Sequence, residues 1–81
     1  MSQFMNAKRP AHEIRLGAVR AIIWQTSPHE EPNYHISISR IARPGEQPRR
    51  ADEFDADDLP LVAEVVDLAH LWICEQAELI A

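Results

Sequence analysis

Apolar residues in the last third of the chain recur with the period of an α-helix. Between residues 57 and 81 they return every three or four positions, and no glycine or proline follows Pro60. This spacing predicts one amphipathic helix, with Asp57 and Asp58 as N-cap candidates and Pro60 in the first turn. At a rise of about 1.5 Å per residue, the helix would be roughly 33 Å long. The acidic residues of this segment fall on its remaining side: Glu64, Asp67, Glu75 and Glu78.

Stretches nearer the N-terminus alternate apolar and polar residues, as strands do. Residues 12–26 contain two apolar runs of opposite phase, and the phase changes at Gly17-Ala18. A glycine at this point favours a bulge or a tight bend between two short strands. Residues 34–42 alternate cleanly, with an imidazole and two hydroxyl groups on one face, and residues 51–54 are a weaker candidate for a short edge strand.

These elements predict an α+β fold, an antiparallel β-meander of three or four strands followed by one long C-terminal helix packed on one face. Residues 27–33 and 43–50 contain four of the six prolines and are expected to form loops. Residues 1–11 lack periodicity and are expected to be a flexible tail. The remaining residues, 12–81, are enough for one domain and one core.

Charge is distributed unevenly along the chain. The formal net charge is −5, yet all eight basic residues lie in residues 1–50, together with only four of the 13 acidic residues. Residues 51–81 hold the other nine acids and no lysine or arginine. A basic body that carries an acidic helix can bind a polyanion on its basic side. The alternative is that the separation of charge serves solubility and attraction between subunits.

One face of the predicted sheet combines cationic and aromatic side chains. Once the change of phase at Gly17 is absorbed, Arg15, Arg20 and Trp24 fall on the face away from the apolar residues. Guanidinium groups beside an indole suit the phosphates and bases of a single strand. Alternatively, the arginines are solvated and the indole covers the edge of the core. The candidate nucleic-acid-binding residues on or near this face are Arg15, Arg20, Trp24, His35, Ser37, Ser39, Arg40, Arg43, Arg49 and Arg50.

The sequence contains no glycine-rich phosphate loop, nucleophile elbow or HExxH motif. Its four histidines lack the spacing of metal ligands, and the single Cys74 excludes both an intrachain disulfide and a structural zinc site. We therefore expect no catalytic residue, metal or cofactor, and a packed thiol at Cys74. A lone cysteine, no signal peptide and no apolar run of about 20 residues predict a cytoplasmic protein without a membrane span.

The apolar side of the predicted helix is wider than one short sheet would cover. Leu71 also lies among the acidic residues, where a solvated face would not favour an apolar side chain. Because a domain of this size buries only about 60–65% of its unfolded surface, self-association is expected. We predict a homodimer with an interface at Leu68, Leu71, Trp72, Glu75 and Leu79. The alternative is that the acidic helix face docks a basic partner protein.

Residues 9–76 resemble a family of small bacterial proteins that share two motifs. The first has the form EIRxGxxxAxIW and matches residues 13–24, and the second has the form DDLPxxAxVxxxAHxWI and matches residues 57–73. The layout of strands followed by one long helix also resembles the Whirly-like and transcriptional-coactivator-type single-stranded DNA-binding domains. That resemblance implies a curved sheet that binds the strand and a helix that forms the dimer interface.

Together, these observations favour a binding protein over an enzyme. The hypothesis is a homodimer that exposes a basic sheet face to single-stranded DNA or RNA, as a transcriptional regulator would. The competing hypothesis is a protein–protein interaction or scaffold module that uses the acidic helix face.

Overall fold

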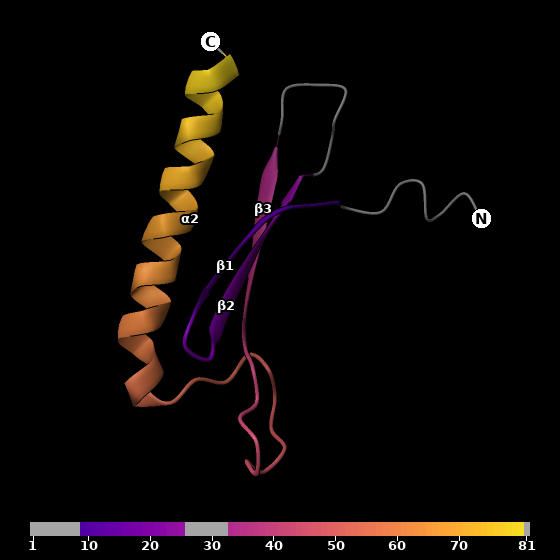
Figure 1. Ribbon diagram of the computed structural model, residues 1–81, viewed down its shortest axis with the longest axis vertical. Coiled ribbons are helices and arrows are strands. Elements are labelled where there is room, and N and C mark those ends of the chain that lie inside the picture. The colour runs from indigo at the N-terminus through magenta and orange to yellow at the C-terminus, as the bar shows by residue number, and fades with distance from the viewer. Residues whose placement is uncertain (1–8, 26–32, 81) are drawn as a thin grey trace, which may run out of the picture.

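The computed structural model describes residues 9–25 and 33–80, which form one antiparallel sheet and one long helix (Figure 1). The sheet has the strand order β1-β2-β3, with β1 (Arg9–Leu16), β2 (Val19–Gln25) and β3 (Tyr34–Arg40). A short 3-10 turn, η1 (Ala56–Asp58), leads into α2 (Leu59–Ile80), which packs on one face of the sheet. The predicted α+β fold is confirmed. Residues 27–32 of the predicted loop and residues 1–8 of the predicted tail lie outside the described residues.

A two-residue turn joins β1 to β2 at the predicted change of phase. Gly17 has a φ of 59°, which glycine adopts without steric cost, and Ala18 completes the turn. Leu16 and Val19 pair directly on either side of it. A Cβ on Gly17 would lie 3.1 Å from Cδ1 of Leu61 on α2, so the missing side chain also lets the turn approach the helix.

β1 starts three residues earlier than the alternation predicts. Arg9 pairs with Gln25 and Pro10 with Trp24, and the register then shifts at Ala11. This bulge interrupts the alternation and therefore hides the strand in the sequence. Pro10 is compatible with its position because β1 is an edge strand of the described sheet, where a missing N–H costs little.

The core lies between β2 and α2. Val19, Ala21 and Ile23 point from β2 toward the helix, and Val65 and Ala69 point from the helix toward β2; all five are fully buried. Because β2 is the central strand, its helix-facing side chains are covered from both sides, whereas Ile36 on β3 remains 42% exposed. The helix packs mainly over β1 and β2 and contacts β3 least.

Trp72 extends the core toward the C-terminal half of α2. Its ring stacks on the imidazole of His12 with centroids 4.9 Å apart and planes 5° from parallel. Tyr34 approaches the same indole edge-on, at 5.6 Å and 86°. One helix residue thus contacts both outer strands, and aromatic pairs in these geometries contribute beyond simple burial.

A capping box starts the helical segment, two residues earlier than predicted. Asp55 is the N-cap, and its side chain accepts from the backbone of Asp58, whose own carboxylate accepts from the backbone N–H of Asp55 at 2.9 Å. Asp57 is exposed and is not the cap. Residues 51–54 form a turn and a coil rather than the suggested edge strand. Only the Ala51 carbonyl reaches β3, where it accepts a 2.7 Å bond from the Arg40 N–H.

Candidate nucleic-acid interface on the open sheet face

The face of the sheet opposite α2 carries no other helix or strand of the described chain (Figure 1). None of the side chains that the strand alternation places on it is buried. The pairing of the strands arranges them in three rows, each crossing β1, β2 and β3 in that order. The rows are Arg15–Arg20–Ser39, then Glu13–Ile22–Ser37, then Pro10–Trp24–His35. Six of the ten predicted binding residues therefore share this open face: Arg15, Arg20, Trp24, His35, Ser37 and Ser39.

Two arginines lie directly opposite each other in the first row. Arg15 and Arg20 are paired across β1 and β2, and like charges in such a pair repel. Arg15 Nε donates to the Gly17 carbonyl at 3.2 Å, and no acidic side chain of the described residues lies within 4 Å of this guanidinium. Arg20 Nε lies 3.3 Å from Oε2 of Glu13, in an ion pair whose side chains are 39% and 52% exposed. That nitrogen is buried and makes no hydrogen bond with the described residues.

The third row holds the aromatic side chain. Trp24 is half-buried, and its Nε1 donates a hydrogen bond of 2.9 Å to Oγ of Ser37 on the neighbouring strand. This bond fixes the indole against β3 and leaves an aromatic surface beside the exposed imidazole of His35. The arginine row and the tryptophan row are separated by four residues along β2, or about 13 Å.

Arg40 requires a correction, because it does not belong to this face. It pairs with Val19 at the end of β3, and its side chain points to the helix side, where it is 3% exposed. Nε donates to Oδ2 of Asp58 at 2.8 Å, and Nη1 donates to Oε2 of Glu46 at 2.6 Å. The even-numbered residues of β3 share the helix side, so the alternation of the strand already placed Arg40 there.

Arg49 and Arg50 are held by carboxylates within the 41–55 connection. Arg49 makes two hydrogen bonds of 2.8 and 2.9 Å to Asp55, and Arg50 makes two of 2.9 Å to Asp52. The guanidinium of Arg49 holds the pKa of Asp55 below its usual range, and that of Arg50 does the same for Asp52. Because their charge is neutralised locally, both arginines are poor candidates for phosphate contacts.

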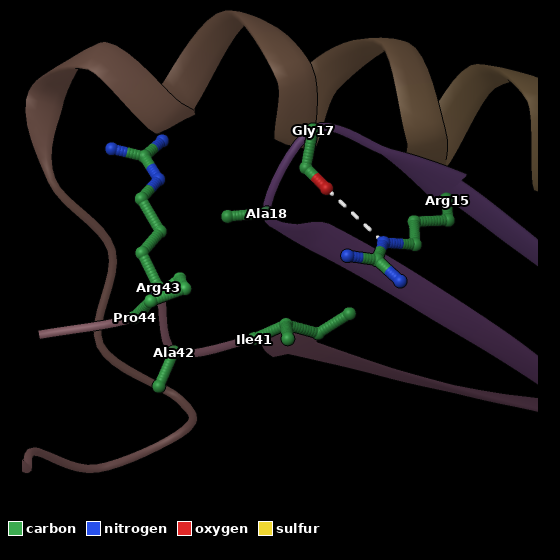
Figure 2. A pocket seen from close by; sticks show the side chains of 7 residues that line it. All are labelled: Arg15, Gly17, Ala18, Ile41, Ala42, Arg43 and Pro44. Carbon is green, nitrogen blue, oxygen red and sulfur yellow. Dashed lines mark hydrogen bonds between the residues drawn. The ribbon is translucent and has the colours of Figure 1, made fainter. Parts of the chain in front are cut away.

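Arg43 differs from these arginines because its side chain is 60% exposed and its guanidinium comes no closer than 3.8 Å to a carboxylate of the described residues, that of Asp58. It borders a cavity of about 180 Å³ at the turn end of the sheet, and Arg15 borders the same cavity from β1 (Figure 2). A 2.7 Å bond from the Ile41 N–H to the Ala18 carbonyl closes the sheet at this end. The lining residues are Arg15, Gly17, Ala18, Ile41, Ala42, Arg43 and Pro44. No sequence pattern indicates this cavity, because it forms only when the turn meets the end of β3.

The predicted interface residues also come together in part. Leu68, Leu71, Trp72 and Glu75 line one cavity of about 300 Å³, together with His12 and Ile14 of β1. Leu71 is 54% exposed, as expected for an apolar residue among the acids of α2. The side chain of Leu79 lies outside the described residues. The role of this surface as a dimer interface stays a prediction.

Cys74 is exposed rather than packed, because it follows the buried Val65 by two and a half helical turns and therefore points away from the sheet. Its Sγ lies 3.5 Å from Nε2 of His70. No group of three or more histidine, cysteine or acidic side chains in residues 9–25 and 33–80 is arranged to hold a metal ion.

Comparison of the chain with protein-family models, with curated proteins and with solved structures finds no match in any of the three. The two family resemblances drawn from the sequence motifs and the layout therefore stay predictions. Within residues 9–25 and 33–80, no helix combines the length and the apolar character that a membrane span requires.

Proposed function

We propose that this protein binds single-stranded nucleic acid on the open face of its sheet. The observation that carries the proposal is the direct pairing of Arg15 with Arg20 on a face that also presents Trp24. Two guanidinium groups opposite each other destabilise a sheet unless an anion lies between or above them. Glu13 offsets one of them through a single ion pair at the surface. A phosphate would supply the missing negative charge.

The spacing of the rows fits a single nucleic-acid strand that runs along β2, from the arginine row to the tryptophan row. Rows lie about 7 Å apart along β2, so phosphates on the arginine row leave room for a base on the indole two rows away. A base stacked on an aromatic side chain contributes about 1–3 kcal/mol without regard to its identity. The small hydroxyl side chains of Ser37 and Ser39 border the bases without covering the face.

Duplex recognition is less consistent with the charge distribution. Reading the major groove requires an element that can enter it, and an α-helix does so with a basic surface. The only long helix of the described residues carries Glu64, Asp67, Glu75 and Glu78 and no lysine or arginine. The open sheet face with its indole suits unpaired bases instead.

Fluorescence anisotropy with a labelled oligothymidylate at low salt tests the proposal. We expect Trp24→Ala and Arg20→Ala each to raise Kd by at least about fivefold. Arg20→Ala should also flatten the dependence of log K on log salt by about 0.7, the value for one phosphate contact on a single strand.

Arg50→Ala provides the matched control. It removes the same charge, but from an arginine held by Asp52 outside the open face, and it should leave Kd nearly unchanged. Absence of binding at micromolar protein, or an equal loss in the Arg20 and Arg50 variants, would contradict the proposal.

A further inference from the structure

The outer edge of β1 carries backbone groups that have no partner within the described sheet. Because a two-residue turn joins β1 to β2, Leu16 and Val19 form a hydrogen-bonded pair, and so does Ile14 with Ala21. Glu13 and Arg15 alternate with these residues along β1 and therefore point their N–H and C=O groups away from β2. Such an edge is a template for pairing with another strand.

We propose that two copies of this chain pair through this edge, antiparallel, with the twofold axis at Ile14. In this register Glu13 of each protomer faces Arg15 of its partner, so the four outward backbone groups of each strand form ladder hydrogen bonds. The same alignment brings the Glu13 carboxylate of one protomer next to the Arg15 guanidinium of the other. Twofold symmetry repeats this ion pair, as an isologous interface requires.

The charges of Glu13 and Arg15 favour this register over the two registers in which the twofold axis is shifted by one residue along β1. A twofold axis at Glu13 would place two glutamates directly opposite each other, and an axis at Arg15 would oppose two arginines. Like charges in facing positions are destabilising, and opposite charges are favourable. The segment Glu13-Ile14-Arg15 is complementary to itself only when Ile14 faces Ile14.

The helix side of β1 fits the same arrangement. The cavity that contains Leu68, Leu71 and Glu75 opens beside His12 and Ile14, at the flank of α2 nearest this edge. Because α2 packs mainly over β1 and β2, strands 4.8 Å apart would place the two helices about 10–14 Å from each other. A helix with its side chains is about 10–12 Å wide, so the flanks would meet. Leu71, which is 54% exposed, would be covered.

Joining the edges would give one sheet of six strands with a continuous open face. In this register the Arg15–Arg20–Ser39 row of each protomer would continue into the Glu13–Ile22–Ser37 row of its partner. The two joined rows would hold two Arg15, two Arg20 and two Glu13 side chains and would keep a net positive charge. Dimerisation does not rest on nucleic-acid binding, because its contacts involve only the protein.

Sedimentation equilibrium of charge-exchange variants, without nucleic acid, tests the proposed register. Wild type is expected to be a dimer at micromolar concentration. Glu13→Arg and Arg15→Glu should each weaken the dimer by at least about tenfold, because each opposes like charges across the axis. The double variant E13R/R15E restores opposite charges and should restore the dimer. A monomeric wild type, or a double variant no better than the single ones, would overturn the proposal.

Disulfide cross-linking locates the edge independently. Ile14 facing Ile14 would be a non-hydrogen-bonded pair with Cα atoms about 4.5 Å apart, which a disulfide can bridge. In a Cys74→Ser background, I14C should form a covalent dimer with oxidised glutathione. The control is I36C, which places the thiol on the helix side of the opposite edge strand and should stay monomeric. Cross-linking through I36C but not I14C would overturn the proposal and place the contact at β3.

Discussion

Nε of Arg40 donates a 2.8 Å hydrogen bond to Oδ2 of Asp58, and the two side chains are 3% and 2% exposed. The bond links the end of β3 to the first turn of the helical segment, 18 residues later in the chain. Asp58 also accepts from the Asp55 N–H, so one carboxylate both caps the helix and neutralises a buried cation. This pair fixes the helix against the sheet and explains why Arg40 is not available to a ligand.

Removing the buried carboxylate should be far more damaging than removing an exposed one. Asp58→Asn leaves the Arg40 charge buried with fewer partners, and breaking such a pair is strongly destabilising. We expect Tm to fall by more than about 10 °C, since small domains lose several degrees for each kcal/mol. Asp52→Asn, which breaks a surface pair with Arg50, should change Tm little. Thermal unfolding followed by circular dichroism would measure both, and equal shifts would contradict this account.

The same carboxylates predict a loss of stability in acid. The pKa of Asp58 is lowered by the Asp55 N–H and by Arg40, and the pKa of Glu46 is lowered chiefly by the Arg43 N–H and also by Arg40. A depressed pKa in the folded state means that the unfolded chain binds protons first as the pH falls. The stabilisation is therefore fully present above the ordinary pKa values of 3.8 and 4.5 and is lost below them.

Urea unfolding at a series of pH values would test this expectation. The midpoint should be nearly constant from pH 7 to pH 5 and should fall steeply below about pH 4.5. In Asp58→Asn this fall should be smaller, because one of the titrating groups is gone. A wild-type midpoint that does not change between pH 5 and pH 3 would show that these ion pairs contribute nothing to stability.

The two glycines with positive φ allow two effects of a substitution to be distinguished: strain in the backbone, and a clash between the new Cβ and a neighbouring side chain. Gly17 (φ 59°) faces Leu61 of α2, whereas Gly45 (φ 80°) has no atom within 4 Å of where a Cβ would be. Replacing either with alanine should cost about 1–2 kcal/mol because the left-handed conformation disfavours a Cβ. Gly17→Ala should cost more, because Leu61 must also move. Chemical denaturation would show the difference, and a larger loss in Gly45→Ala would contradict the proposed contact.

The sequence predicts which face a side chain occupies wherever the period of apolar and polar residues is unbroken along a whole strand or helix. The alternation at 34–40 and the two phases around Gly17 were enough to place Arg15, Arg20 and Trp24 on one face, and the helical period of 59–80 identified the acidic side of α2. Arg40 also obeyed the alternation, which groups it with Ile36 and Ile38. Its charge suggests the open face, but its position in the strand places it on the helix side.

Other features depend on contacts that no local pattern encodes. The sequence offers Arg49 and Arg50 as candidate binding residues, but the 41–55 connection brings Asp55 and Asp52 against them. The true N-cap, Asp55, is not evident from the sequence, because the capping box here uses a second aspartate, Asp58, in place of the usual glutamate. The cavity between Arg15 and Arg43 exists only in the folded chain.

Trp24 itself offers the most direct measurement of the central claim. The chain has two tryptophans, so Trp72→Phe leaves Trp24 as the only indole and keeps an aromatic ring against His12. Titration of this variant with unlabelled oligothymidylate at low salt should quench the tryptophan fluorescence as a base stacks on the ring, and added salt should reverse the quenching. Fluorescence that does not change at saturating oligonucleotide would contradict a nucleic-acid site on the open face of the sheet.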